Sequence, residues 1–196
     1  MEAPALHRLT YQEFREMEFA DDDPFQYELL DGELRQKSAP SPRHQELSGS
    51  LYMVIRQHIT EKRLGKVFYA PIDVFLNDYN APQPDLVYVS EVKTGLITND
   101  GIMGRNAGPA PDLVIEILSP SSLRRDRRKK MNIYERFAIP EYWIADPLNQ
   151  SVEVYGYGPS ERYELVGEIA AVQDAGQYVI TSRVLPDLSL DIRTLF

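Results

Sequence analysis

One acidic residue stands in the middle of a strongly apolar segment of this chain. Glu116 lies in PDLVIEILSPSS, and the run from Leu113 to Leu118 has the apolar, β-branched composition of a strand buried on both faces. Burying an ionised carboxylate without a partner is costly. A metal ion, a cationic partner such as Lys130, or protonation of the acid would each offset that cost, and each implies a different function.

A second acid is placed so that it could share a site with Glu116. Asp85 follows Pro84 at the start of an expected strand, where a proline is tolerated and the next side chain can reach a cleft. If the two strands are neighbours, both carboxylates can meet at one level of the sheet. Converging carboxylates suit Mg²⁺ or Mn²⁺, and with a nearby cation they could support hydrolysis of a phosphodiester. Asp112 does not qualify as the partner, because it lies roughly 13 Å along the same strand from Glu116.

Other residues are weaker candidates for the same chemistry. Asp73 interrupts the apolar run PIDVFL and shares a face with Asp85 in one hairpin register, which makes it a secondary metal ligand. Lys130 could help to activate water, or it could pair with Asp126 at i, i+4, a contact worth only about 0.2–0.5 kcal/mol. His44, in the first turn of an expected helix, is better explained as a capping or packing residue than as a ligand.

Composition limits the classes of protein to which the chain can belong. Its 196 residues suit one domain with a full hydrophobic core, and its lack of cysteine excludes thiol nucleophiles, thiolate metal sites and disulfides. Without a recognisable signal peptide or a long apolar run, we expect a cytoplasmic protein with no membrane partner. The net charge of −9 argues against a general nucleic-acid coat protein, yet residues 124–130 read RRDRRKK, six cations around one acid.

The elements that must position these residues can be read from local patterns. Thr10 and Glu13 form a capping box for a short helix, Asp31-Gly32 favours a tight hairpin, and Ser41 caps a long helix that we expect to end at Gly65. An antiparallel strand pair is expected next, at 66–76 and 84–90. A long irregular connection at 91–110 follows, and irregular segments of that length are often functional loops. The last expected elements of this part are a strand at 112–118, a helix at 122–137 and a strand at 142–145. Alternating strands after residue 150 predict an antiparallel extension of the same domain.

This order resembles the PD-(D/E)XK nucleases, whose core runs helix, three strands, helix, strand. Pro84-Asp85 matches the PD and Glu116 the second acid, but Leu118 stands where that superfamily has its lysine. Some members carry the lysine on the helix after the third strand. Lys130, on one helical face with Asp126 and Tyr134, is the candidate for that migrated residue.

More narrowly, the chain is similar to the Uma-type endonuclease family of bacteria. The shared segments run from about Tyr11 to Pro147 and are YELLDGEL, SPRH, PIDVFL, QPDLVYVS, PDLVIEILSPSS, a D-x-x-x-K-x-x-x-Y helix and PEYWIADP. The resemblance implies an α/β, restriction-endonuclease-like fold for residues 1–196. Residues 1–40 would form the N-terminal helix and hairpin, 41–147 the nuclease-like core and 148–196 a β extension.

The expected function is that of a Mg²⁺-dependent or Mn²⁺-dependent endodeoxyribonuclease. Asp85 and Glu116 would hold the metal and Lys130 would assist the attack of water, while an acid beside the hairpin turn, Glu33 or Glu28, commonly completes such sites in the superfamily. The basic segment would contact the DNA backbone through Arg124, Arg125, Arg127, Arg128 and Lys129. A homodimer is a further expectation, because many such nucleases cut two strands with two subunits. One alternative is a non-catalytic nucleic-acid-binding or assembly module on the same fold, and another is a nuclease for a different phosphodiester substrate, such as RNA or a branched structure.

Overall fold

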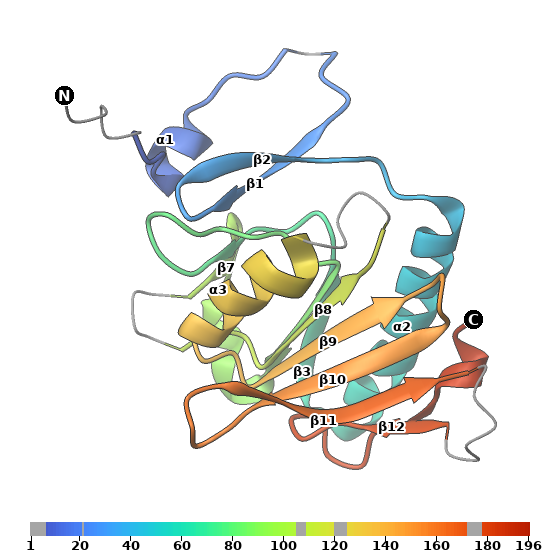
Figure 1. Cartoon of the computed structure of the whole chain (residues 1–196). Coiled ribbons are helices and arrows are strands. Elements are labelled where there is room, and N and C mark those ends of the chain that lie inside the picture. Colours follow the sequence, from blue (N-terminus) through green and yellow to red (C-terminus); the bar gives the residue numbers. More distant parts are fainter. Residues whose placement is uncertain (1–6, 21, 105–108, 120–124, 172–177) are drawn as a thin grey trace.

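A six-stranded mixed sheet forms the centre of the protein (Figure 1). The computed structural model describes residues 7–20, 22–104, 109–119, 125–171 and 178–196. The strand order is β11-β10-β9-β8-β5-β3, with β8 and β9 parallel and the other neighbouring pairs antiparallel. The strands are β3 (Gly65–Tyr69), β5 (Leu86–Ser90), β8 (Leu113–Ile117), β9 (Glu141–Asp146), β10 (Ser151–Tyr157) and β11 (Tyr163–Ala170).

A long helix, α2 (Pro42–Lys62), covers one face of the sheet (Figure 1). The Ser41 hydroxyl accepts a hydrogen bond from the backbone N–H of His44, and Pro42 occupies the first helical position, as the sequence predicts. Its apolar stripe is fully buried against the sheet and consists of Leu47, Leu51, Ile55 and Ile59. The predicted end at Gly65 was wrong, because Arg63 already adopts the left-handed conformation that closes the helix.

The opposite face carries a shorter helical segment. It begins as a π-helical stretch, η2 (Arg125–Lys130), and continues as α3 (Met131–Arg136). Ile133 and Tyr134 are fully buried there against side chains of β5, β8 and β9. The prediction of one uniform helix over 122–137 is therefore corrected to a π-helical stretch followed by a short α-helix, and residues 122–124 lie outside the described residues.

The N-terminal part forms a cap over one end of the sheet (Figure 1). The hairpin of β1 (Gln26–Leu30) and β2 (Glu33–Lys37) turns at Asp31 and Gly32, whose φ angles of 56° and 76° suit a tight two-residue turn. Helix α1 (Tyr11–Arg15) begins at the predicted capping box of Thr10 and Glu13. Both local predictions are confirmed.

The segment between β3 and β8 departs most from the predicted elements. The strand predicted over 66–76 stops at Tyr69, and β4 (Val74–Phe75) pairs instead with β7 (Gly101–Met103) in a separate three-stranded sheet with β6 (Ile97–Thr98). Pro71 lacks an N–H and cannot continue the ladder of β3, which explains the break. The connection predicted as irregular over 91–110 is thus partly ordered, since it holds η1 (Glu91–Leu96), β6 and β7.

The C-terminal part confirms the predicted antiparallel extension in β10 and β11. The last strands, β12 (Val179–Thr181) and β13 (Ser189–Asp191), pair with each other and precede a short helical turn, η3 (Ile192–Thr194). Leu185, Leu188 and Leu190 add their side chains to the core beneath α2. Within the described ranges, no helix combines the length and the apolar composition needed to cross a bilayer.

Candidate active site

The two acids predicted to share a site lie on neighbouring strands. Strands β5 and β8 pair in the register that sets Leu86 opposite Ile115, so Asp85, one residue earlier, lies level with Glu116. The Asp85 carboxylate accepts a hydrogen bond of 2.7 Å from the backbone N–H of Ile117. The expectation that these strands are neighbours is therefore confirmed, and the sheet itself fixes the two carboxylates relative to each other.

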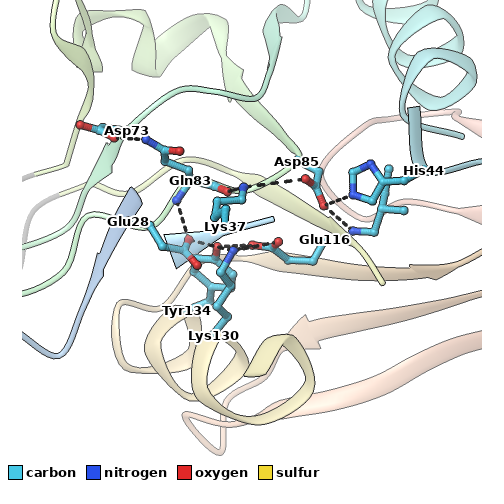
Figure 2. A network of polar contacts seen from close by, with 10 residues as sticks. Glu28, Lys37, His44, Asp73, Gln83, Asp85, Glu116, Lys130 and Tyr134 are labelled. Carbon is cyan, nitrogen blue, oxygen red and sulfur yellow. Dashed lines mark hydrogen bonds and ion pairs between the residues drawn. The ribbon is translucent and has the colours of Figure 1, made fainter. Parts of the chain in front are cut away.

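A buried cluster of charges surrounds Glu116 (Figure 2). The ammonium of Lys130 lies 2.9 Å and 3.0 Å from the two carboxylate oxygens of Glu116, and 3.0 Å from Glu28 Oε2. The Tyr134 hydroxyl donates to Glu116 Oε1 at 2.6 Å. Each of these four side chains is at most 2% exposed. Two carboxylates thus share one ammonium in the protein interior, where an unpaired charge would be strongly destabilising.

The lysine reaches Glu116 from the helical segment, while residue 118, which directly follows β8, is apolar. Leu118 is 3% exposed and packs among the side chains on the α3 side of the sheet. Lys130 ends the π-helical stretch and Tyr134 follows one turn later, so both side chains point from the same side onto β8 (Figure 2). Burial, followed by the charge of Glu116, raises the pKa of Tyr134 well above its usual value, so its hydroxyl remains a neutral donor.

Asp85 has its own set of partners. Burial alone would raise its pKa, but the hydrogen bond to His44 and the charge of Lys37 outweigh burial and hold the pKa below the usual value. His44 Nε2 lies 3.3 Å from Asp85 Oδ2, and Lys37 Nζ lies 4.0 Å from Asp85 Oδ1. Asp85 is therefore a charged carboxylate in a nearly dry environment.

His44 has a role that the sequence interpretation missed. It was expected to cap or pack, yet its ring lies against Asp85, and its buried Nδ1 has no hydrogen-bond partner among the described residues. The signal was the SPRH motif, in which Ser41 fixes the start of α2 three residues earlier. That start directs the His44 side chain towards the sheet.

These side chains face one cavity of about 710 Å³ between α2, the hairpin and the sheet. Its acidic, basic and imidazole side chains are Glu28, Lys37, His44, Asp85, Glu116 and Lys130. A volume of this size is typical of small-molecule sites. The cavity therefore brings together the two acids and the lysine that the sequence singled out with Glu28, one of the two hairpin acids considered, and adds Lys37 and His44 to them.

The carboxylates that line the cavity suit a hard divalent cation that takes only a few of its ligands from the protein. Mg²⁺ is commonly bound through one or two carboxylates, with water and substrate phosphate completing its shell. Asp85, charged and facing the cavity, and Glu116 on the adjacent strand provide such a pair. In the part of the chain that the structure describes, no three acidic or histidine side chains are grouped as a metal site. The pair of Asp85 and Glu116 therefore fits a two-carboxylate site.

The weaker metal-ligand candidates lie elsewhere. Asp73 accepts hydrogen bonds from Gln83 and Tyr11 and lines a second, shallower hollow. Glu33 is exposed on the outer side of the hairpin, where Lys129 binds it at 2.9 Å. Glu28, which the sequence could not separate from Glu33, is the acid of the hairpin that reaches the cavity.

The basic segment is partly engaged with acids of the protein. Arg127 donates to both carboxylate oxygens of Glu153 at 2.6 Å and 3.0 Å, and Lys129 pairs with Glu33. Arg128 is exposed. Arg124 and the side chain of Arg125 lie outside the described residues.

Comparison with known proteins places the chain in a family. Residues 11–193 match the model of Uma2, described as "Putative restriction endonuclease". The chain belongs to the Uma2 family. The resemblance drawn from the sequence motifs is confirmed, and the match reaches beyond those motifs into the C-terminal strands.

A solved structure has the fold of this Uma2 chain. It is the crystal structure of a putative nuclease belonging to DUF820 from Anabaena variabilis, with a TM-score of 0.74 and 23% sequence identity. The match covers 96% of this chain and 97% of the other. No curated protein matches the chain.

Proposed function

We propose that this Uma2 protein is a metal-dependent endonuclease that hydrolyses DNA phosphodiester bonds on a restriction-endonuclease-like core. One observation carries the proposal: the Lys130 ammonium lies 2.9 Å from Glu116 on the wall of the cavity that Asp85 also faces. A lysine beside the second acid is what the PD-(D/E)XK arrangement requires, and here it is supplied although residue 118 is leucine.

Each residue has a distinct part in the proposed reaction. Asp85 and Glu116 would hold Mg²⁺ or Mn²⁺, which when bound would neutralise phosphate charge and acidify a water molecule. The hydrogen bonds from Ile117 and His44 keep the Asp85 carboxylate oriented, and the Tyr134 hydroxyl does the same for Glu116. Lys130 would orient the attacking water and stabilise the charge that develops on the phosphate.

Further parts of the proposal concern the DNA and the assembly. Arg128, together with Arg124 and Arg125, would attract the DNA backbone, and Arg127 and Lys129 would have to exchange their acidic partners for phosphates to do so. Residues 1–196 would act as one domain, and two copies in a symmetric dimer would present two sites to the two strands.

The test is divalent-dependent nicking of supercoiled plasmid by purified protein. We expect nicked product with Mg²⁺ or Mn²⁺ and none with a chelator, and we expect the Glu116→Gln variant to lose the activity. Glu33→Gln is the matched control, because it neutralises a glutamate on the outside of the hairpin and should leave nicking intact. Equal traces from wild type and Glu116→Gln would overturn the proposal.

The second candidate is a non-catalytic DNA-binding module, and the same cluster favours it in one respect. Lys130 compensates Glu28 and Glu116 directly, so the buried acids do not need a metal for stability. Calorimetry separates the two candidates. Heat of Mn²⁺ binding that disappears in Asp85→Asn supports the nuclease, whereas no metal binding together with salt-dependent DNA affinity supports the module.

A further inference from the structure

The cavity continues past the charged cluster along one face of α2. His44, Ser48 and Tyr52 follow one another at i, i+4 and i+8, and Gln45 and Gly49 lie beside them. Eight residues of helix span roughly 12 Å. The charged cluster therefore lies at one end of an elongated groove, and the α2 face forms a wall leading away from it.

This wall carries no acidic side chain. The acids that line the cavity within the described residues are Glu28, Asp85 and Glu116, all at the cluster end. The α2 wall instead presents hydroxyl, amide, imidazole and aromatic groups, in a chain with 30 acidic residues. A wall of this composition does not repel a DNA backbone that extends along α2 from the charged cluster.

Two tyrosines stand at the far end of the groove. The rings of Tyr52 on α2 and Tyr69 at the end of β3 meet edge to face, with centroids 5.0 Å apart and planes at 83°. Tyr69 is 60% exposed although it has an aromatic neighbour, so its ring is accessible from solvent. An exposed ring held in place by a second ring is a surface on which a nucleic-acid base can stack.

Between the cluster and the tyrosines, α2 carries a glycine. A Cβ placed on Gly49 would meet nothing within 4 Å, so neither packing nor backbone conformation requires glycine there. Glycine in a helix interior destabilises the helix relative to alanine. The missing side chain leaves room for close approach of a ligand to the helix surface.

We propose that this groove binds an unpaired nucleotide of a DNA strand, with its base on Tyr69 and its backbone passing Ser48 and Gly49. The proposal rests on the proposed function, because that function places the neighbouring phosphate at Asp85 and Glu116. A cavity of about 710 Å³ has the size of a small-molecule site, so a nucleotide fits in it, and only a base that has left the duplex stack can lie on the Tyr69 ring. The substrate class is therefore single-stranded or locally unpaired DNA.

The test is equilibrium binding of a labelled single-stranded DNA oligonucleotide, with Ca²⁺ in place of Mg²⁺ so that the acids at the phosphate position can be neutralised while cleavage is not supported. Removal of one stacking ring in Tyr69→Ala should weaken binding about 5-fold to 150-fold, while Tyr69→Phe should retain it. Tyr157→Ala is the matched control. Tyr157 also meets a second tyrosine, Tyr163, edge to face at 6.1 Å, but it does not line the cavity.

A second variant tests the groove without removing a ring. Gly49→Gln adds a helix-favouring side chain into open space, so it should fold normally and still weaken single-strand binding at least 5-fold. A blunt duplex of the same sequence should bind more weakly than the single strand.

The proposal is overturned if Tyr69→Ala and Gly49→Gln bind like Tyr157→Ala, if the duplex binds as tightly as the single strand, or if RNA of the same sequence binds more tightly than DNA. These readouts need no turnover. Failure of the proposed nuclease activity would therefore leave them interpretable.

Discussion

Replacing Lys130 with methionine should destabilise the fold far more than replacing the lysine beside it. Lys130→Met keeps an unbranched chain one atom shorter but removes the ammonium that lies 2.9 Å from Glu116 and 3.0 Å from Glu28. Both acids are at most 2% exposed, so the variant leaves two carboxylates in the interior without that cation. Breaking a buried pair in this way costs about 3–5 kcal/mol. For a chain of this size, that loss corresponds to a decrease in Tm of roughly 6–20 °C.

The matched control is Lys129→Met. Lys129 also pairs with a glutamate at 2.9 Å, but Glu33 is 55% exposed, so the pair is worth at most about 1 kcal/mol. Urea unfolding at pH 7, with thermal unfolding as a second measure, should separate the two variants by at least about 2 kcal/mol. Adding Glu28→Gln to Lys130→Met should restore part of the loss, because one buried charge is then removed.

The reasoning is refuted if both lysine variants unfold within about 1 kcal/mol of each other. It is also refuted if Glu28→Gln destabilises the Lys130→Met background instead of rescuing it. Either result would mean that the ammonium is not what makes burial of the two acids tolerable.

Three further outcomes follow from the same structure. Tyr134→Phe removes the 2.6 Å hydrogen bond to Glu116 but no ring atoms, and it should cost about 1.5–3 kcal/mol in urea unfolding; a loss below 0.5 kcal/mol would contradict the role of the hydroxyl. Asp85 has a lowered pKa in the folded state, so its stabilisation should be fully present above about pH 4 and be lost as pH falls through the folded value. The unfolding free energies of wild type and Asp85→Asn should therefore converge in acid, and a gap that widens as pH falls would contradict the assignment. Gly49→Ala should stabilise the protein by about 0.5–1 kcal/mol, since the added Cβ meets no atom within 4 Å, and a decrease in Tm would show that the site is more crowded than described.

Features determined by neighbouring residues could be predicted from the sequence. The Asp31-Gly32 turn and the Ser41 cap depend on chemistry within a few residues, and both were predicted correctly. The approach of Lys130 to Glu116 was also foreseeable, because an apolar residue at 118 leaves the acid without a partner on its own strand.

Features determined by long-range packing could not be predicted. Glu28 and Glu33 flank the same turn, and which of them faces the cavity depends on how the hairpin lies over the sheet. Likewise, Arg127 of the π-helical stretch is neutralised by Glu153, a residue 26 positions away on β10. The strand predicted over 66–76 failed for a different reason, since its apolar composition continues past Pro71 although the hydrogen-bonded ladder does not.

Because Lys130 lies on a helical segment and Glu116 on β8, the sheet alone does not fix the lysine relative to the acid. A lysine at residue 118 would be held near Glu116 by the backbone of the same segment, and its position would not depend on how the helices pack on the sheet. Here the contact instead depends on how the segment of Ile133 and Tyr134, both fully buried, lies on the sheet. A shift of that helix would draw the ammonium away from Glu28 and Glu116 and leave both carboxylates buried without their cation. The packing of one short helical segment therefore maintains both the charge balance of the interior and the place of the lysine at the site.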